Sequence, residues 1–234
     1  MNNFQIRFIE ATEIPTNLPP VTGWKHVPSL SFEESVKGLP IPHINDNVEF
    51  YLDVGDNFVL ENDDSVLTKD EFCAIYLYTL EVLHKPLNAT LNEKEDRNDK
   101  IKPYHFYIKL INSALEKLPR YRDNVWRGVK TDKDFSGKYV KGKKIVWWSY
   151  TSTSKEGKAV QNFLGETGHR LLFQIRSKTG VDITKYSAFK NEAEILFAMG
   201  TKFQVKNVVE QDKLTIIELE ELSSIFSSTV KLPK

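Results

Sequence analysis

The chain has 234 residues, of which 40% are hydrophobic and 12% aromatic; this composition excludes general disorder and suits a globular protein with a well-buried core. Lys plus Arg and Asp plus Glu both number 32, so the formal net charge is zero and gives no overall attraction to nucleic acid or to an anionic membrane. The single cysteine, Cys73, excludes an intramolecular disulfide and fits a reducing compartment, although a chain exported without disulfides would look the same.

The first 64 residues form an N-terminal extension that is rich in Pro and Asn. We interpret them as loops and short elements, with a short helix near 31–36, an apolar patch at 47–54 and at most one strand. Their start lacks a continuous apolar stretch behind positive charges, so no signal peptide is expected. No apolar run anywhere approaches the roughly 20 residues needed to span a bilayer.

Residues 65–119 have the spacing of helices. Thr68 followed by Glu71 matches a capping box, in which two side chains satisfy the free amides of a helix start. Apolar residues then recur at helical spacing up to Leu83. A second helix is predicted to open at Pro103, a residue tolerated in a first turn, and the charged stretch 91–100 between the two is predicted to be an exposed connection.

Residues 120–222 have the spacing of strands, and a tail follows at 223–234. Strands are predicted at 125–129, 145–148, 170–176, 194–198, 201–208 and 213–219, with one helix after Ser154. Helices followed by strands predict an α+β fold, and the absence of a repeat or a long linker favours one compact domain over 65–222.

Several kinds of site are not supported by the sequence. There is no glycine-rich dinucleotide or P-loop motif, and no nucleophile-elbow motif supports a Ser-His-Asp triad. The five histidines are scattered and the cysteine stands alone, so no metal site is predicted.

Two polar motifs interrupt the strands of the C-terminal half. Arg127 lies within an apolar β-prone run and precedes Gly128, so it serves either an internal salt bridge or a bound phosphate or carboxylate. The hydroxyl run Ser152-Thr153-Ser154 follows a strand, and on its own it favours a helix N-cap over a site.

A third motif places two carboxylates two residues apart, at Glu192 and Glu194, where a loop enters a strand. If the backbone is extended there, both side chains project from one face, and mutual repulsion could separate their pKa values and their roles. On its own, an exposed acidic pair at a strand start is the more common arrangement.

In this order and spacing, the three motifs resemble the arginine–serine–glutamate group of mono-ADP-ribosyltransferases, which includes bacterial toxins and eukaryotic ecto-enzymes. The resemblance extends over roughly residues 65–222 through the segments at 67–79, 113–119, 179–183, 186–196 and 200–205. It implies a split β-sandwich holding NAD⁺, with a helical subdomain on the N-terminal side.

The resemblance also implies roles for the motif residues. Arg127 would contact the phosphate or nicotinamide ribose of NAD⁺, and the backbone of Gly128 would receive the carboxamide. Ser152 would orient Glu194, which stabilises the ribose cation, while Glu192 deprotonates the acceptor arginine. The expected cofactor-binding set also includes Thr153, Ser154 and Phe163, although a core position in the helix after Ser154 explains Phe163 equally well.

The implied substrate pair is NAD⁺ and a target protein with an exposed arginine, for which actin and small GTPases are precedents in the family. Nucleic acid and membrane partners are not expected. The loops near 136–144 and 187–191 would choose the target. The alternatives left open are an NAD⁺ glycohydrolase, a transferase to a non-arginine acceptor, and an inactive interaction module. The expected location is the cytoplasm, or a host or neighbouring cell reached without a signal peptide.

Overall fold

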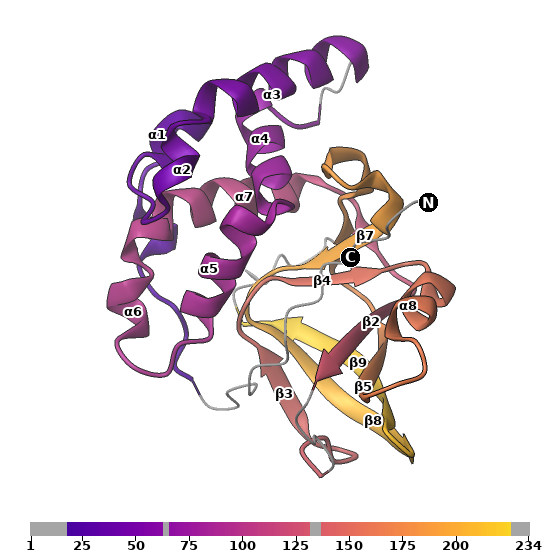
Figure 1. Cartoon of the computed structure of the whole chain (residues 1–234). Coiled ribbons are helices and arrows are strands. Elements are labelled where there is room, and N and C mark those ends of the chain that lie inside the picture. Colours follow the sequence, from indigo (N-terminus) through magenta and orange to yellow (C-terminus); the bar gives the residue numbers. More distant parts are fainter. Residues whose placement is uncertain (1–17, 63–65, 132–136, 226–234) are drawn as a thin grey trace, which may run out of the picture. The chain divides into compact units, whose positions relative to one another are not determined.

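The computed structural model describes residues 18–62, 66–131 and 137–225 (Figure 1). These residues divide into two compact units. The helical unit consists of residues 21–119 and 181–191, and the β unit consists of 18–20, 120–180 and 192–225. Most of the predicted tail, and the first 17 residues of the predicted extension, lie outside the described residues. In the part of the chain described, no helix is long and apolar enough to cross a membrane.

The helical unit confirms the helices that have local start signals. Ser31 and Thr68 each close a capping box with the glutamate three residues later. Glu71 has a second role, because its buried carboxylate also accepts hydrogen bonds from Ser113 (2.8 Å) and Lys117 (2.7 Å). The helices of the first 119 residues are η1 (Trp24–His26), α1 (Phe32–Val36), α2 (Pro42–Asn45), α3 (Val48–Asn62), α4 (Lys69–Tyr78), α5 (Glu81–Leu91), α6 (Arg97–Lys100), η2 (Lys102–Tyr104) and α7 (His105–Lys117).

Three predictions for this unit are wrong in detail. The apolar patch at 47–54 does not lie among loops and short elements but begins a helix of 15 residues, α3. The helix after Thr68 ends at Tyr78, so Leu83 belongs to α5. Residues 91–100 are not wholly an exposed connection, because they contain α6, in which Arg97 is buried and donates to the Leu91 carbonyl at 3.1 Å.

The strands form one nine-stranded sheet in the order β1-β6-β7-β4-β2-β5-β9-β8-β3. β5 and β9 are parallel, and the neighbouring pairs β2–β5, β2–β4, β4–β7, β8–β9 and β3–β8 are antiparallel. The strands are β1 (Arg120–Tyr121), β2 (Asn124–Thr131), β3 (Lys144–Trp147), β4 (Thr151–Ser154), β5 (His169–Arg176), β6 (Gly180–Asp182), β7 (Glu194–Phe197), β8 (Thr201–Gln211) and β9 (Leu214–Ser224).

The predicted strands are present with shifted ends, and helices followed by one mixed sheet agree with the predicted α+β class. β9 continues to Ser224, so it includes residues that were assigned to the tail. The hydroxyl run is not a helix cap but the strand β4 itself, and the helix behind it, α8 (Gly157–Leu164), starts three residues later.

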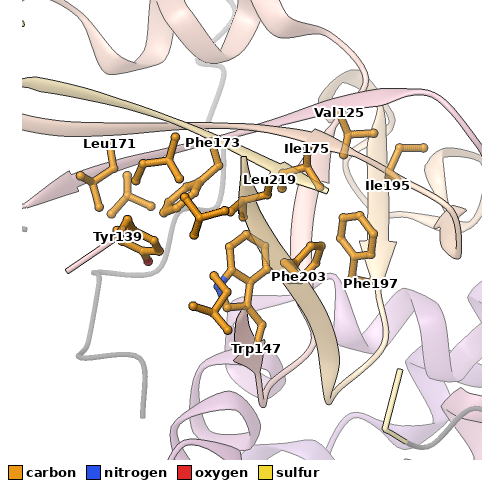
Figure 2. Packing of buried hydrophobic residues seen from close by; sticks show 14 residues of the cluster. Val125, Tyr139, Trp147, Leu171, Phe173, Ile175, Ile195, Phe197, Phe203 and Leu219 are labelled. Atoms are coloured by element: carbon orange, nitrogen blue, oxygen red, sulfur yellow. The ribbon is translucent and has the colours of Figure 1, made fainter. Parts of the chain in front are cut away.

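The main core of the β unit lies on one face of this sheet (Figure 2). Aromatic rings from β3, β5, β7 and β8 pack together in it, with Trp147 set edge-to-face against Phe173 at 5.4 Å between ring centroids. A smaller cluster packs α8 on the other side of β2 and β5 through Val160, Leu164 and Leu172. The alternation of side chains along β2 therefore decides which of its residues meet the core and which meet α8.

Candidate active site

Arg127 lies where strands β2 and β4 begin to separate. β2 pairs with β5 at eight positions, but its paired register with β4 consists of Trp126 opposite Ser154. Just beyond that pair, the Arg127 guanidinium donates a hydrogen bond of 2.7 Å to the Ser152 backbone carbonyl. The charged side chain therefore joins the two strands at the point where their paired register ends.

The hydroxyls of the Ser-Thr-Ser strand fix the backbone around β7. Thr153 donates to the Ile195 carbonyl at 2.7 Å, and Ser154 donates to the Glu192 carbonyl at 2.8 Å. The Ser154 hydroxyl also accepts from the Glu156 amide at 3.0 Å. Both side chains are buried, so these contacts support a positioning role for them; direct contact with NAD⁺ stays a prediction.

The two glutamates belong to different secondary-structure elements. Glu194 is the first residue of β7, lies opposite Ser154 in the register and is 1% exposed. Glu192 ends the 3-10 helix η4 (Lys190–Glu192) and is 8% exposed, and Ala193 between the two has a positive φ of 47°. The extended backbone that was expected to align the pair is therefore absent, and a tight turn places Glu192 instead.

Ser152 and Glu194 nevertheless share a face of the sheet. Ser152 lies opposite Leu196 and Ser154 lies opposite Glu194, and directly paired residues project to the same side. Ser152 is half-buried. Arg127, Ser152, Glu192 and Glu194 thus come from adjacent strands and one turn of a single unit. Their contact with a bound dinucleotide stays a prediction.

Gly128 and Phe163 both pack at α8. A Cβ on Gly128 would lie 2.9 Å from Cγ of Leu164 and 3.1 Å from Cγ1 of Val160, so the close approach of α8 by itself requires this glycine. Phe163 is half-buried beside the α8 cluster, and the ammonium of Lys130 lies 4.6 Å from its ring centroid. These contacts account for both residues without a ligand, and their predicted contacts with nicotinamide are not tested by them.

Two aromatic residues beside Arg127 were not singled out from the sequence. Tyr139 is buried in the main core; burial raises the pKa of its hydroxyl, while the positive charge of Arg127 acts in the opposite direction. Trp126 precedes Arg127 and packs against Gly157 of α8. A β-prone run around an arginine is the only sequence signal for Trp126, and Tyr139 has none, because it follows a Lys- and Gly-rich loop.

No group of three or more His, Cys, Asp or Glu side chains in the described residues could hold a metal ion. Cys73 is buried and donates to the Tyr51 carbonyl at 3.2 Å, and burial raises the pKa of its thiol to about 12. We therefore assign it no chemistry.

Residues 61–227 match the model of the NAD:arginine ADP-ribosyltransferase family, which is most of the chain. The chain belongs to this family. The residues that match the NAD:arginine ADP-ribosyltransferase family include all four candidate catalytic residues and more than half of each unit.

Among curated relatives, Mav of Mycobacterium avium is 39% identical over 118 residues, which are 49% of this chain and 14% of Mav. The NAD(+)–protein-arginine ADP-ribosyltransferase Tre1 of Serratia proteamaculans is 27% identical over 158 residues, 68% of this chain and 33% of Tre1. The chain thus spans half or less of the length of the curated relatives it matches.

Solved structures confirm the fold. The ADP-ribosyltransferase Vis in complex with agmatine superposes with a TM-score of 0.59 at 22% identity, covering 77% of this chain and 88% of Vis. The type III effector XopAI from Xanthomonas axonopodis pv. citri superposes with a TM-score of 0.66 at 19% identity, covering 86% and 92%.

Proposed function

We propose that this chain is a mono-ADP-ribosyltransferase that cleaves NAD⁺, releases nicotinamide and transfers ADP-ribose to an arginine of a target protein. The observation that carries the proposal is the arrangement around β4: Arg127 bonds to Ser152 on one side, and Ser154 faces Glu194 and bonds to the Glu192 turn on the other. This places a cation and two carboxylates around one strand.

In the proposed reaction, the bond between nicotinamide and C1′ of the ribose breaks first, and the electron pair leaves with nicotinamide. The ribose acquires the charge of an oxocarbenium ion. Glu194 would accept a hydrogen bond from the 2′-hydroxyl and stabilise this charge, and its fixed position in β7 means that it needs no reorganisation. The Arg127 guanidinium would hold a phosphate by charge-assisted hydrogen bonds.

The acceptor is an arginine guanidinium, which is protonated near neutral pH because its pKa exceeds about 12. Glu192 would orient this group and take its proton as a guanidinium nitrogen attacks C1′. Two carboxylates with different partners resemble the division of roles in inverting glycosidases. Glu192 lies in a 3-10 turn and Glu194 in a strand, and this difference supports such a division.

Family membership also supports a setting for this activity. XopAI is an effector and Vis is a toxin by their descriptions, and the Vis complex contains agmatine, a small guanidine. We propose that the chain likewise acts as a toxin or effector on a protein arginine in another cell. Actin and small GTPases are candidate targets that the family resemblance suggests.

The test compares wild type, Glu194→Gln and Glu192→Gln, each incubated with labelled NAD⁺ alone, with agmatine and with a cell lysate. Glu194→Gln should lose nicotinamide release in all three. Glu192→Gln should keep release with NAD⁺ alone and lose labelling of agmatine and protein.

The outcome separates the alternatives. Release without labelling by the wild type indicates an NAD⁺ glycohydrolase, and a mass spectrum that places the adduct elsewhere than arginine indicates another acceptor. A wild type that releases no nicotinamide is an inactive interaction module, and the proposal is then wrong. Glu210→Lys, an exposed substitution in β8 outside the site, is the control for effects of mutation and purification that are unrelated to the site.

A further inference from the structure

A groove of about 420 Å³, lined mainly by polar and charged residues, lies on the β unit, on the sheet face that α8 partly covers. The catalytic proposal does not use it. Strands β2, β5, β9 and β8 form it, and its lining residues are Asn124, Trp126, Gln174, Arg176, Lys206, Glu218, Leu219 and Glu220. We call it the outer-sheet groove.

The strand register connects the outer-sheet groove to the candidate catalytic carboxylate. Glu194 lies opposite Ser154, and Ser154 lies opposite Trp126. The same row continues from Trp126 to Gln174 and from Gln174 to Glu218. Directly paired residues project to one face, so all five side chains lie on the face that carries Glu194.

The distance along this row is fixed by strand spacing. Neighbouring strands lie about 4.8 Å apart, so Gln174 is about 14 Å and Glu218 about 19 Å from Glu194 along the sheet. Gly157, at the start of α8, covers one side of the Trp126 indole, where an added Cβ would lie 2.8 Å from the ring. The groove therefore begins beside α8 and extends away from the carboxylate.

Two charged side chains of the groove are available to bind a partner. Arg176 and Glu218 are exposed, and neither forms an ion pair or a side-chain hydrogen bond within the described part of the chain. By contrast, Glu220 pairs with Lys178 at 3.2 Å and Lys206 at 3.1 Å. The groove thus presents one unpaired cation and one unpaired anion beside an indole.

We propose that the outer-sheet groove docks the segment of the target protein next to its acceptor arginine. This proposal rests on the proposed function. An extended chain covers about 3.3 Å per residue, so residues about four to six positions from the arginine would reach the groove. The segment would place a basic side chain against Glu218 and an acidic one against Arg176, with an apolar side chain against Trp126.

The chemistry of the groove favours a protein segment over other occupants. Sites for small molecules are mostly apolar and enclose the ligand, whereas charged residues line much of this groove. Its two cations and two anions balance, so it does not attract a polyanion such as nucleic acid. Trp and Arg are common among residues that dominate protein interfaces, and mixed charges select the partner.

The experiment measures three reactions of the whole chain: nicotinamide release from NAD⁺ alone, ADP-ribosylation of agmatine, and labelling of proteins in a cell lysate. The variants are Glu218→Lys, Arg176→Glu and the two together, none of which removes a buried contact. The control is Glu210→Lys, the same charge change at an exposed position near the far end of the β8–β9 hairpin, opposite Thr215.

We expect the groove variants to lower protein labelling about tenfold or more, because unlike charges become like charges at the interface. Nicotinamide release and agmatine labelling should stay within about twofold of wild type, since agmatine is too small to reach the groove. Protein labelling equal to that of Glu210→Lys would overturn the docking proposal alone. So would a parallel fall of all three reactions. A wild type that releases no nicotinamide would overturn the proposed function and this proposal with it.

Discussion

Gly128 offers a direct test of how α8 is held on the sheet. A Cβ at this position would approach Cγ of Leu164 to 2.9 Å and Cγ1 of Val160 to 3.1 Å. A third contact, to Cδ2 of Leu164, would be 3.0 Å, and the β-branched Val160 has one strongly preferred rotamer in a helix, so α8 and these side chains must shift to make room. Overpacking of this kind costs about 1–3 kcal/mol, and we expect Gly128→Ala to lower the free energy of unfolding by that amount.

A double-mutant cycle with Leu164→Ala shows whether this contact is the cause. Leu164 is 3% exposed, so its truncation alone should cost about 2–5 kcal/mol. In that background the added methyl of Gly128→Ala occupies the new cavity, and its own cost should nearly vanish in urea unfolding. Gly38→Ala, whose added Cβ would meet nothing within 4 Å, is the control and should change stability by less than about 1 kcal/mol.

Costs of Gly128→Ala and Leu164→Ala that add within about 0.5 kcal/mol would refute the packing argument. Nicotinamide release should fall in Gly128→Ala and recover in part in the double variant with Leu164→Ala. If it stays lost while stability recovers, Gly128 serves the nicotinamide directly, as the family resemblance implies.

Three further predictions concern single groups. Ser154→Ala removes the hydroxyl bonded to the Glu192 carbonyl and should cost about 1–3 kcal/mol; agmatine labelling should fall more than NAD⁺ hydrolysis, measured in parallel. Burial raises the pKa of Glu71, but hydrogen bonds led by Lys117 outweigh it and lower that pKa. Its stabilising contribution is thus present above the unfolded pKa of about 4.3 and lost as pH falls through the folded pKa, so Glu71→Gln should flatten the acid side of the stability profile. Ala193→Gly should relieve about 1 kcal/mol of backbone strain at φ 47°. It should also lower agmatine labelling relative to NAD⁺ hydrolysis, because glycine makes the Glu192 turn less rigid. An unchanged ratio of the two rates would contradict this.

Elements with local signals were predictable from the sequence. The capping boxes at Ser31 and Thr68 fix helix starts through side chains only three residues apart. The β-prone run around Arg127 predicted β2 because alternation in a half-buried strand is visible in a short window. The order of the three polar motifs along the chain was enough to indicate the family that the comparison then confirmed.

The helix α3 was missed because its local pattern favours a strand. Val48, Phe50, Leu52 and Val54 occupy every second position, which is the period of a strand, and Tyr51 lies between two of them. The buried stripe is instead Tyr51, Gly55 and Phe58, at helical spacing. Gly55 is needed because a Cβ there would lie 2.6 Å from the sulfur of Cys73. Contact with another helix decides this element, and a short sequence window does not contain that contact.

The Glu-x-Glu motif shows the same limit at the site. Ala has no special preference for a left-handed backbone, so nothing in the letters Glu-Ala-Glu predicts φ 47° at Ala193. The turn is held from β4, through the Ser154 hydroxyl to the Glu192 carbonyl and the Lys155 amide to the Ala193 carbonyl at 3.1 Å. Glu194 is thus part of the sheet, whereas Glu192 depends on a turn that two contacts hold. In the proposed chemistry this separation has a use: the carboxylate that acts on the invariant NAD⁺ is rigid, and the one that meets the acceptor can be changed by loop substitutions without disturbing the strand.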